Sequence, residues 1–146
     1  MFIATGGGSG YLPKAPGTWG SLVGVLLWLA LGRLRLAAYL AVVLALLVMG
    51  VIAAGAAEKI VDRPDPGLVV IDEIVGQLIV LTAAPLQLPV VVAGFALFRF
   101  FDILKPFPVG WLDRHIHGGL GIMLDDAMAG LYGLLALQAG LYLLGP

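Results

Sequence analysis

Two pairs of adjacent carboxylates stand at the borders of apolar stretches in this chain. Asp72-Glu73 opens one stretch and Asp125-Asp126 opens another. One interpretation is helix capping, because acids near a helix start gain about 0.3–1 kcal/mol from the helix dipole. The other is metal binding, because crowded carboxylates repel one another unless a divalent cation lies between them, and Mg²⁺ prefers oxygen ligands. Capping explains less well why two pairs and Asp102 occur without as many nearby bases, so the pattern favours a Mg²⁺ site.

A third motif combines basic residues with an acid at helical spacing. Arg99 and Asp102 are three residues apart and would share one helix face, and Lys105 precedes Pro106. The motif is either an intrahelical ion pair ended by the proline or a phosphate clamp beside a metal ligand. Arg grips phosphate through two hydrogen bonds, and Lys acts as a point charge. We favour the clamp, because ionisable residues at membrane depth usually serve a function.

The Gly-rich start and a His-x-His pair carry weaker signals. Pro13 occupies the third glycine position of a dinucleotide fingerprint, and no Gly-Lys-Ser/Thr follows, which disfavours a nucleotide site. Pro16-Gly17-Thr18 is typical of a turn with Thr18 as a helix N-cap, and its backbone N–H groups could also hold an anion. His115 and His117 lack the third His or Cys of a zinc site, which favours a role in a solvated loop.

The elements that must position these residues are strongly apolar. The 146 residues are 61% hydrophobic with a mean hydropathy of +1.06, more than a soluble domain usually carries. A net charge of −1 provides no basic field and argues against a nucleic-acid partner. The absence of cysteine excludes a disulfide scaffold and thiolate chemistry. The length predicts one domain over residues 1–146.

Five apolar stretches predict five helices and an all-α fold. Only the second and fifth approach the ~20 residues that cross a ~30 Å hydrocarbon core. One interpretation is a compact membrane bundle with short, tilted or broken spans, including a hairpin broken at Pro85 and Pro89. The other makes the second stretch the buried central helix of a soluble domain, but the outer polar faces that this requires are missing. We favour the membrane bundle. The stretches are Trp19–Gly32, Leu36–Ala57, Ile74–Leu86, Val90–Phe101 and Ala127–Leu144.

Five crossings would gather the charged segments at one face of the membrane. These segments are residues 7–18, Glu58–Glu73 and Arg99–Asp126. They hold six of the eight Lys and Arg residues, whereas Arg33 and Arg35 fall on the opposite side. The positive-inside bias then places the charged segments in the cytoplasm. The sequence therefore predicts one active site, formed by three polar segments at the cytoplasmic face.

Four blocks of sequence, taken in order, resemble the phosphatidylglycerophosphatase A family. The blocks are residues 8–21, Asp72-Glu73-Ile74-Val75-Gly76-Gln77, residues 98–108 and residues 117–126, and together they span almost the whole chain. The resemblance implies a bacterial inner-membrane, multi-pass, Mg²⁺-dependent phosphatase that converts phosphatidylglycerophosphate to phosphatidylglycerol. It also implies an all-α fold, which soluble relatives share, so both structural interpretations stay open.

The resemblance extends to individual positions. Family acids fall on Asp65, Asp72, Glu73, Asp102, Asp113, Asp125 and Asp126, and family bases fall on Arg99, Lys105 and Arg114. We expect Mg²⁺ to be held by Asp72, Glu73, Asp125 and Asp126. We expect the substrate phosphate to contact Lys14, Thr18, Arg99 and Lys105. Asp102 would be a further ligand or the base that orients the attacking water, although a covalent aspartyl phosphate on Asp102 or Asp72 is an alternative.

Two other functions would also gather acids at a membrane surface. A membrane phosphotransferase that makes phospholipid headgroups is one, but its usual Asp-Gly…Ala-Arg…Gly…Asp…Asp pattern is absent. A non-enzymatic small cation carrier is the other, but it would place its acids near the middle of a span. The expected partners are therefore a phospholipid substrate and the membrane, without nucleotide or nucleic acid.

Overall fold

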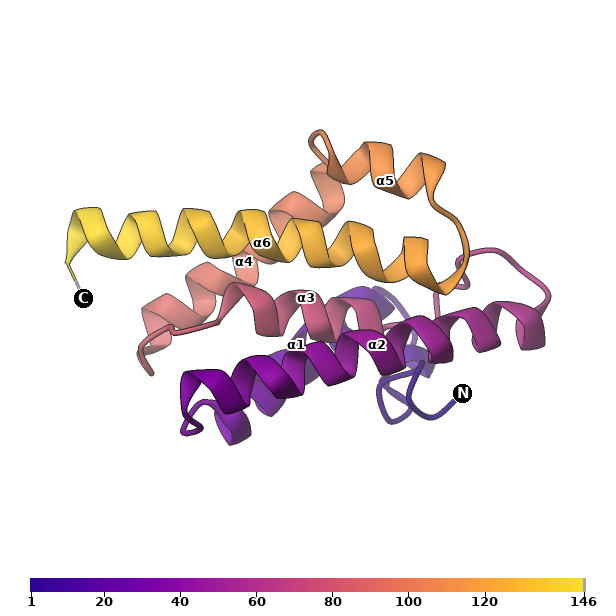
Figure 1. Ribbon diagram of the computed structural model, residues 1–146, viewed down its shortest axis with the longest axis horizontal. Helices are drawn as coiled ribbons and strands as arrows, with labels where there is room; N and C mark the ends of the chain where they lie inside the picture. Colours follow the sequence, from indigo (N-terminus) through magenta and orange to yellow (C-terminus); the bar gives the residue numbers. More distant parts are fainter. Residues whose placement is uncertain (146) are drawn as a thin grey trace.

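The computed structural model describes residues 1–145, which form an all-α fold (Figure 1). Within this range there is no strand, and a short 3-10 turn, η1 (Ser9–Tyr11), precedes six helices. The prediction of an all-α fold is confirmed. The helices are α1 (Pro16–Leu31), α2 (Leu36–Val61), α3 (Ile71–Val80), α4 (Leu88–Leu104), α5 (Val109–His115) and α6 (Gly118–Leu144).

Five of these helices correspond to the predicted apolar stretches, with some boundaries shifted. α3 ends at Val80, well before Pro85, and is shorter than the predicted Ile74–Leu86. α4 begins at Leu88 with Pro89 in its first turn, where the missing backbone N–H breaks no helical hydrogen bond. The short helix α5 was not predicted, because its seven residues are too few to show a helical period.

The start of α6 corrects a prediction that matters for the site. α6 begins at Gly118, so Asp125 and Asp126 lie in its third turn and do not open the helix. The glycines before them look like a loop in the sequence. In the fold, Gly119 lies against the backbone of Val51 in α2, where a side chain would not fit. Capping and dipole effects are confined to the first turn, so they do not account for this acidic pair.

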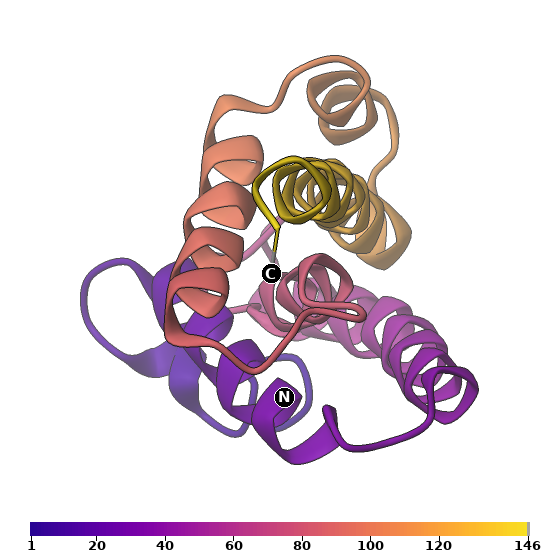
Figure 2. The same cartoon turned by 90° about the vertical axis from the view of Figure 1, so that its left-hand side faces the viewer.

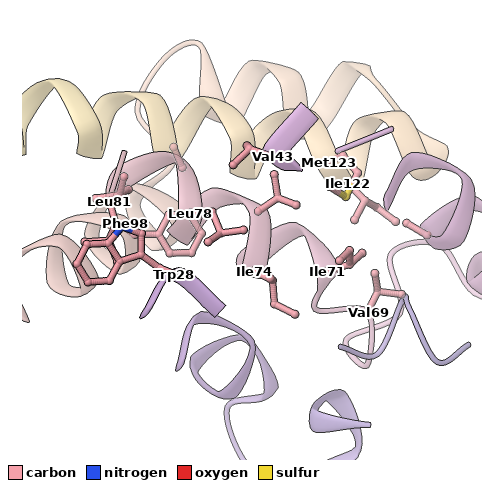
Figure 3. Close-up of a cluster of buried hydrophobic side chains, with 14 of the residues drawn as sticks. Trp28, Val43, Val69, Ile71, Ile74, Leu78, Leu81, Phe98, Ile122 and Met123 are labelled. Carbon is pink, nitrogen blue, oxygen red and sulfur yellow. The ribbon is translucent and has the colours of Figure 1, made fainter. Parts of the chain in front are cut away.

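The short helix α3 lies at the centre of the molecule (Figure 2). It contacts α1, α2, α4 and α6, and eight of its ten residues are buried. Ile74 and Leu78 belong to the apolar core with Trp28 of α1 and Phe98 of α4 (Figure 3). The buried central helix is therefore α3, and the alternative interpretation, which gave this place to Leu36–Ala57, is wrong.

The helices α1 and α6 each pack closely against α3 at a glycine residue. A side chain at Gly24 of α1 would lie 2.8 Å from the Cβ of Gln77, and one at Gly130 of α6 would lie 2.6 Å from the carbonyl oxygen of Gly76. Both separations are too short for carbon atoms, so only glycine lets these helices come so close. The close approach packs the second turn of α3 against both α1 and α6.

Two helices, α2 and α6, are long and apolar enough to cross a membrane. They contain 26 and 27 residues and have hydropathies of 2.8 and 1.6. At 1.5 Å per residue each is roughly 40 Å long, which exceeds a ~30 Å hydrocarbon core. Only 17% and 22% of their apolar segments are buried. Such exposure is consistent with a membrane protein, since helices of this kind expose large apolar side chains where lipid can cover them.

Successive long helices run in opposite directions. α1, α3 and α6 begin at the end of the molecule where α2 and α4 finish (Figure 1). α3, with ten residues and a length of about 15 Å, reaches only part of the way to the other end. The three polar segments are therefore gathered at one end of the bundle, as predicted.

Candidate active site

A polar pocket of about 340 Å³ lies where the three charged segments meet. Its walls come from the start of α1, the end of α2, the loop before α3, and parts of α3, α4, α5 and α6. All of the chain's carboxylate side chains except that of Asp62 line it, together with two bases. The charged lining residues are Glu58, Asp65, Asp72, Glu73, Arg99, Asp102, Lys105, Asp113, Asp125 and Asp126.

Three carboxylates form a compact cluster inside this pocket. Asp72 and Glu73 come from the first turn of α3, and Asp126 comes from the third turn of α6. One oxygen from each lies within 4.8 Å of the other two. Each residue also has a buried oxygen without a hydrogen-bond partner in the described chain: Asp72 Oδ1, Glu73 Oε2 and Asp126 Oδ2. Converging, unsatisfied carboxylate oxygens fit the ligand set of a divalent cation such as Mg²⁺.

The surroundings of the cluster oppose negative charge. Burial raises the pKa of Asp72 well above its ordinary value, and the nearby charge of Glu73 raises it further. Burial also raises the pKa of Glu73. An adjacent cation would favour the ionised carboxylates and lower both values. The cluster is therefore more stable with either protons or a metal ion than with three free negative charges.

Arg99 of α4 lies beside the cluster. Its Nη1 is 2.6 Å from Asp102 Oδ2, which confirms that the two residues share one helix face. This ion pair lacks hydrogen-bond geometry, and Arg99 Nε and Nη1 are buried without a hydrogen-bond partner. A side chain at Gly17, in the first turn of α1, would lie 3.0 Å from Nη1 and 2.5 Å from Glu73 Oε1. The guanidinium group therefore faces the start of α1 with unused donors, as a phosphate-binding arginine would.

Lys105 forms a second group of charges at the pocket. Its Nζ donates to Asp113 Oδ1 at 2.7 Å and to Asp125 Oδ2 at 2.8 Å. Burial alone would lower the pKa of Lys105, but the hydrogen bonds to both acids outweigh it and raise the pKa. The structure thus joins Asp125 to Lys105, whereas its neighbour Asp126 belongs to the three-carboxylate cluster.

The predicted phosphate contacts near the start of α1 lie partly outside the pocket. Lys14 is exposed, and neither it nor Thr18 lines the pocket wall. The N-cap of α1 is Ala15 and its first residue is Pro16, so Thr18 is the third helical residue. The prediction of Thr18 as N-cap is wrong, because Pro fits the first helical position well and moves the boundary forward. Residues 15–17 line the pocket in their place.

Sequence reasoning missed two residues of the site. Glu58, in the last turn of α2, lines the pocket and accepts a hydrogen bond from the backbone N–H of Asp65 at 3.0 Å. Gly17 lines it because it has no side chain to meet Arg99 and Glu73. Glu58 could have been identified from the sequence, because it is the first acid of the charged segment Glu58–Glu73. Nothing in the sequence alone indicates that Gly17 faces two charged groups.

The two histidines have separate positions. His117 lines the pocket at the N-cap of α6. The ring of His115 stacks on Trp111, with centroids 4.7 Å apart, and its Nδ1 lies 2.8 Å from the carbonyl oxygen of Trp111. Within the described residues, the grouped potential metal ligands are all carboxylates.

Known proteins resemble this chain over most of its length. The family model described as phosphatidylglycerophosphatase A matches residues 2–141. The chain is 41% identical over 139 residues to phosphatidylglycerophosphatase A of Haemophilus influenzae, which covers 94% of this chain and 85% of that protein. It is 41% identical over 130 residues to phosphatidylglycerophosphatase A of Escherichia coli, covering 88% and 76%.

A further relative is a Bacteroides thetaiotaomicron protein whose name provisionally describes a phosphatidylinositol-3-phosphatase. It is 40% identical over 153 residues, covering 99% of this chain and 95% of that protein. No solved structure matches the chain. The family match over nearly all residues and the two relatives at 41% identity show that the chain belongs to the phosphatidylglycerophosphatase A family.

Proposed function

We propose that this protein hydrolyses the phosphate monoester of phosphatidylglycerophosphate, giving phosphatidylglycerol and inorganic phosphate. One observation carries the proposal: three carboxylates, each with a buried and unpartnered oxygen, lie beside an arginine with unpartnered donors in a pocket of about 340 Å³. A metal ion and a phosphate group together would satisfy both sets of atoms. The names of the Haemophilus influenzae and Escherichia coli relatives support this substrate.

The three-carboxylate cluster would hold Mg²⁺ through Asp72, Glu73 and Asp126, and Asp125, the next residue to Asp126 on α6, would be a further ligand if it left Lys105. Mg²⁺ bound there would neutralise charge on the phosphate and lower the pKa of water. The chain's part is to place the oxygens on two packed helices. Because glycines hold the backbones of α3 and α6 in contact, the cluster is preorganised, which limits the cost of rearrangement during the reaction.

The substrate phosphate would lie between the start of α1 and the last turns of α4. Arg99 offers Nε and Nη1, and Lys105 offers a charge held by Asp113 and Asp125. Pro16 has no backbone N–H, and the N–H of Thr18 bonds to the carbonyl oxygen of Ala15. Gly17, which lines the pocket, would therefore offer its backbone N–H to an anion. Lys14 and Thr18 would contribute from the rim. These groups would bind oxygens of the substrate phosphate.

Asp102 is our candidate for orienting the attacking water. It lines the pocket and is fixed by its ion pair with Arg99. A carboxylate there can accept the proton of a water whose oxygen attacks phosphorus, while the bond from phosphorus to the glycerol oxygen breaks. The leaving oxygen takes up a proton and stays with the lipid. The products are the alcohol of phosphatidylglycerol and free phosphate.

We further propose a multi-pass position in the bacterial inner membrane with the pocket on the cytoplasmic face. The two long apolar helices and the six basic residues in the segments on the pocket side support this orientation. The headgroup would enter the pocket from the membrane surface, while the acyl chains stay beside the exposed apolar faces of the bundle.

The decisive experiment is release of inorganic phosphate from phosphatidylglycerophosphate by the protein purified in detergent. We expect release with Mg²⁺, none with EDTA, and at least a 100-fold loss in Asp126→Asn. Asp62→Asn is the matched control, because Asp62 is exposed at the end of α2 and does not line the pocket. It should keep full activity. Equal activity in both variants would refute the metal-site proposal.

Other outcomes would favour the alternative functions. Phosphate transferred to an added alcohol, without free phosphate, would indicate a phosphotransferase. A folded protein that turns over no substrate would favour the non-enzymatic cation carrier over both enzymes. Phosphatidylinositol 3-phosphate as a parallel substrate tests the headgroup, because the Bacteroides thetaiotaomicron relative carries that name. We expect faster release from phosphatidylglycerophosphate.

A further inference from the structure

One buried polar side chain near the site has no role in the mechanism above. Among the described residues, only five have buried side-chain nitrogen or oxygen atoms without a hydrogen-bond partner. Four of the five line the pocket, and the fifth, Gln77, does not. Both polar atoms of the Gln77 amide, Oε1 and Nε2, are unpartnered, and the residue is fully buried. Such groups are rare in folded proteins, because burying an amide without hydrogen bonds is unfavourable.

The position of Gln77 relates it to the site. It lies on α3 four residues after Glu73, so the two side chains are neighbours on one helix face. Both face α1: Gly20 lies close to the Cβ of Glu73, and Gly24 lies close to the Cβ of Gln77. Because Cα–Cβ bonds in a helix tilt toward its N-terminus, the side chain of Gln77 leans toward Glu73 and the pocket. The amide therefore lies one helical turn beneath the cluster.

The unpartnered atoms of Gln77, Arg99 and Glu73 are complementary. Arg99 has two buried donors without acceptors, and Glu73 has a buried acceptor without a donor. Both groups meet at Gly17, two turns of α1 before Gly24, the residue that Gln77 contacts. The amide and the guanidinium group must therefore lean toward each other to form a hydrogen bond. A single amide supplies one acceptor and two donors. Gln77 therefore carries the groups that could satisfy one orphan atom of each kind, an Arg99 donor and the Glu73 acceptor.

We infer that Gln77 is a positioning residue that fixes Arg99 and Glu73 when phosphate is bound. Its Oε1 accepts a hydrogen bond from the Arg99 guanidinium group, and its Nε2 donates to Glu73 Oε2. This inference rests on the proposed function. In the free enzyme the amide stays unsatisfied, which costs stability, and in the loaded enzyme it holds two binding groups at the angle that the phosphate requires.

A positioning role and a packing role for Gln77 predict different effects. Removing a positioning residue lowers activity without lowering Tm, whereas removing a packing residue lowers both. Gln77→Met keeps the side-chain length and removes both polar atoms. We expect kcat/KM for phosphatidylglycerophosphate to fall at least 10-fold while Tm stays equal to the wild-type value or rises. Leu78→Met is the matched control, because Leu78 is the next residue of α3 and is also fully buried. It should leave kcat/KM within twofold.

A double-mutant cycle tests the route through Arg99. If Gln77 acts by holding the guanidinium group, Gln77→Met should cost less than threefold in an Arg99→Lys background. Effects that multiply, or a Gln77→Met enzyme within twofold of wild type, would overturn the inference. A Tm that falls together with activity would also overturn it in favour of packing. Should Gln77→Met fail to fold, Gln77→Leu provides the same comparison.

Binding of inorganic phosphate to the Mg²⁺-loaded protein, measured by calorimetry, gives a readout without turnover. We expect the Kd for phosphate to rise at least fivefold in Gln77→Met and to stay unchanged in Leu78→Met. Wild-type protein that releases no phosphate from the lipid would refute the proposed function. The calorimetric comparison would still decide the role of Gln77, so the two failures are distinguishable. An unchanged Kd in Gln77→Met would refute the inference.

Discussion

Gly17 provides a sharp test of the site, because a single methyl group there would enter it. In Gly17→Ala the new Cβ would lie 2.5 Å from Glu73 Oε1 and 3.0 Å from Arg99 Nη1. Ordinary carbon–oxygen contacts are about 3.4 Å or longer, so the carboxylate must move by about 1 Å. Both clashing atoms are the ends of long side chains. The movement is therefore possible without unfolding α1.

The cost should appear in catalysis rather than in folding. A displacement of about 1 Å in a binding group lowers catalytic rates roughly 100-fold, equivalent to about 2.7 kcal/mol of transition-state stabilisation. Alanine in place of glycine favours a helix by up to about 1 kcal/mol. We therefore expect kcat/KM for phosphatidylglycerophosphate to fall about 100-fold while Tm is unchanged or slightly raised.

A second glycine serves as the matched control. Gly140 lies inside α6, and a side chain there would meet nothing within 4 Å. Gly140→Ala should keep full activity and gain the same helix propensity. Phosphate release from the lipid in detergent measures activity, and thermal unfolding measures Tm. A Gly17→Ala enzyme with activity within threefold of the Gly140→Ala enzyme would refute the assignment of Glu73 and Arg99 to the reacting site.

Three further predictions follow from the charges. Mg²⁺ should raise Tm, since it binds the folded cluster, and Asp126→Asn should abolish most of that rise; an equal rise in both proteins would contradict the site. Lys105→Met should lower kcat/KM at least 10-fold, because Asp113 and Asp125 lose their shared partner; phosphate release measures it. In this cysteine-free chain, an impermeant maleimide applied to spheroplasts should label Arg33→Cys but not Lys59→Cys; the reverse pattern would invert the proposed orientation.

Much of the site's location could be predicted from the sequence, because it depends on simple counting. Two apolar segments separate each charged segment from the next, and an even number of crossings returns the chain to the same end, whatever the exact helix boundaries are. The spacing of Arg99 and Asp102 likewise predicts a shared helix face, since i and i+3 are neighbours in any helix. Both predictions use only local geometry and chain direction.

The details that failed depend on contacts between distant segments. Gly118 to Gly121 look like a loop, yet they start α6, because α2 packs against Gly119 and tolerates no side chain there. The pairing of Lys105 with Asp125, across 20 residues, requires the turn through α5, which has no clear sequence signal. The central place of α3 was missed for a similar reason: helix length suggested α2, but burial depends on the neighbours.

The glycine contacts around α3 also divide the molecule into regions with different tolerance to mutation. At Gly20, Gly24, Gly76 and Gly130 even a methyl group meets backbone or buried atoms of the facing helix, and no rotamer change relieves it. On the outer faces of α2 and α6, a change among large apolar residues alters only contact with the surroundings. In a library of random variants, we expect the survivors to vary freely along those faces while the glycines stay invariant. The invariant glycines would then mark the positions at which other helices pack against α3.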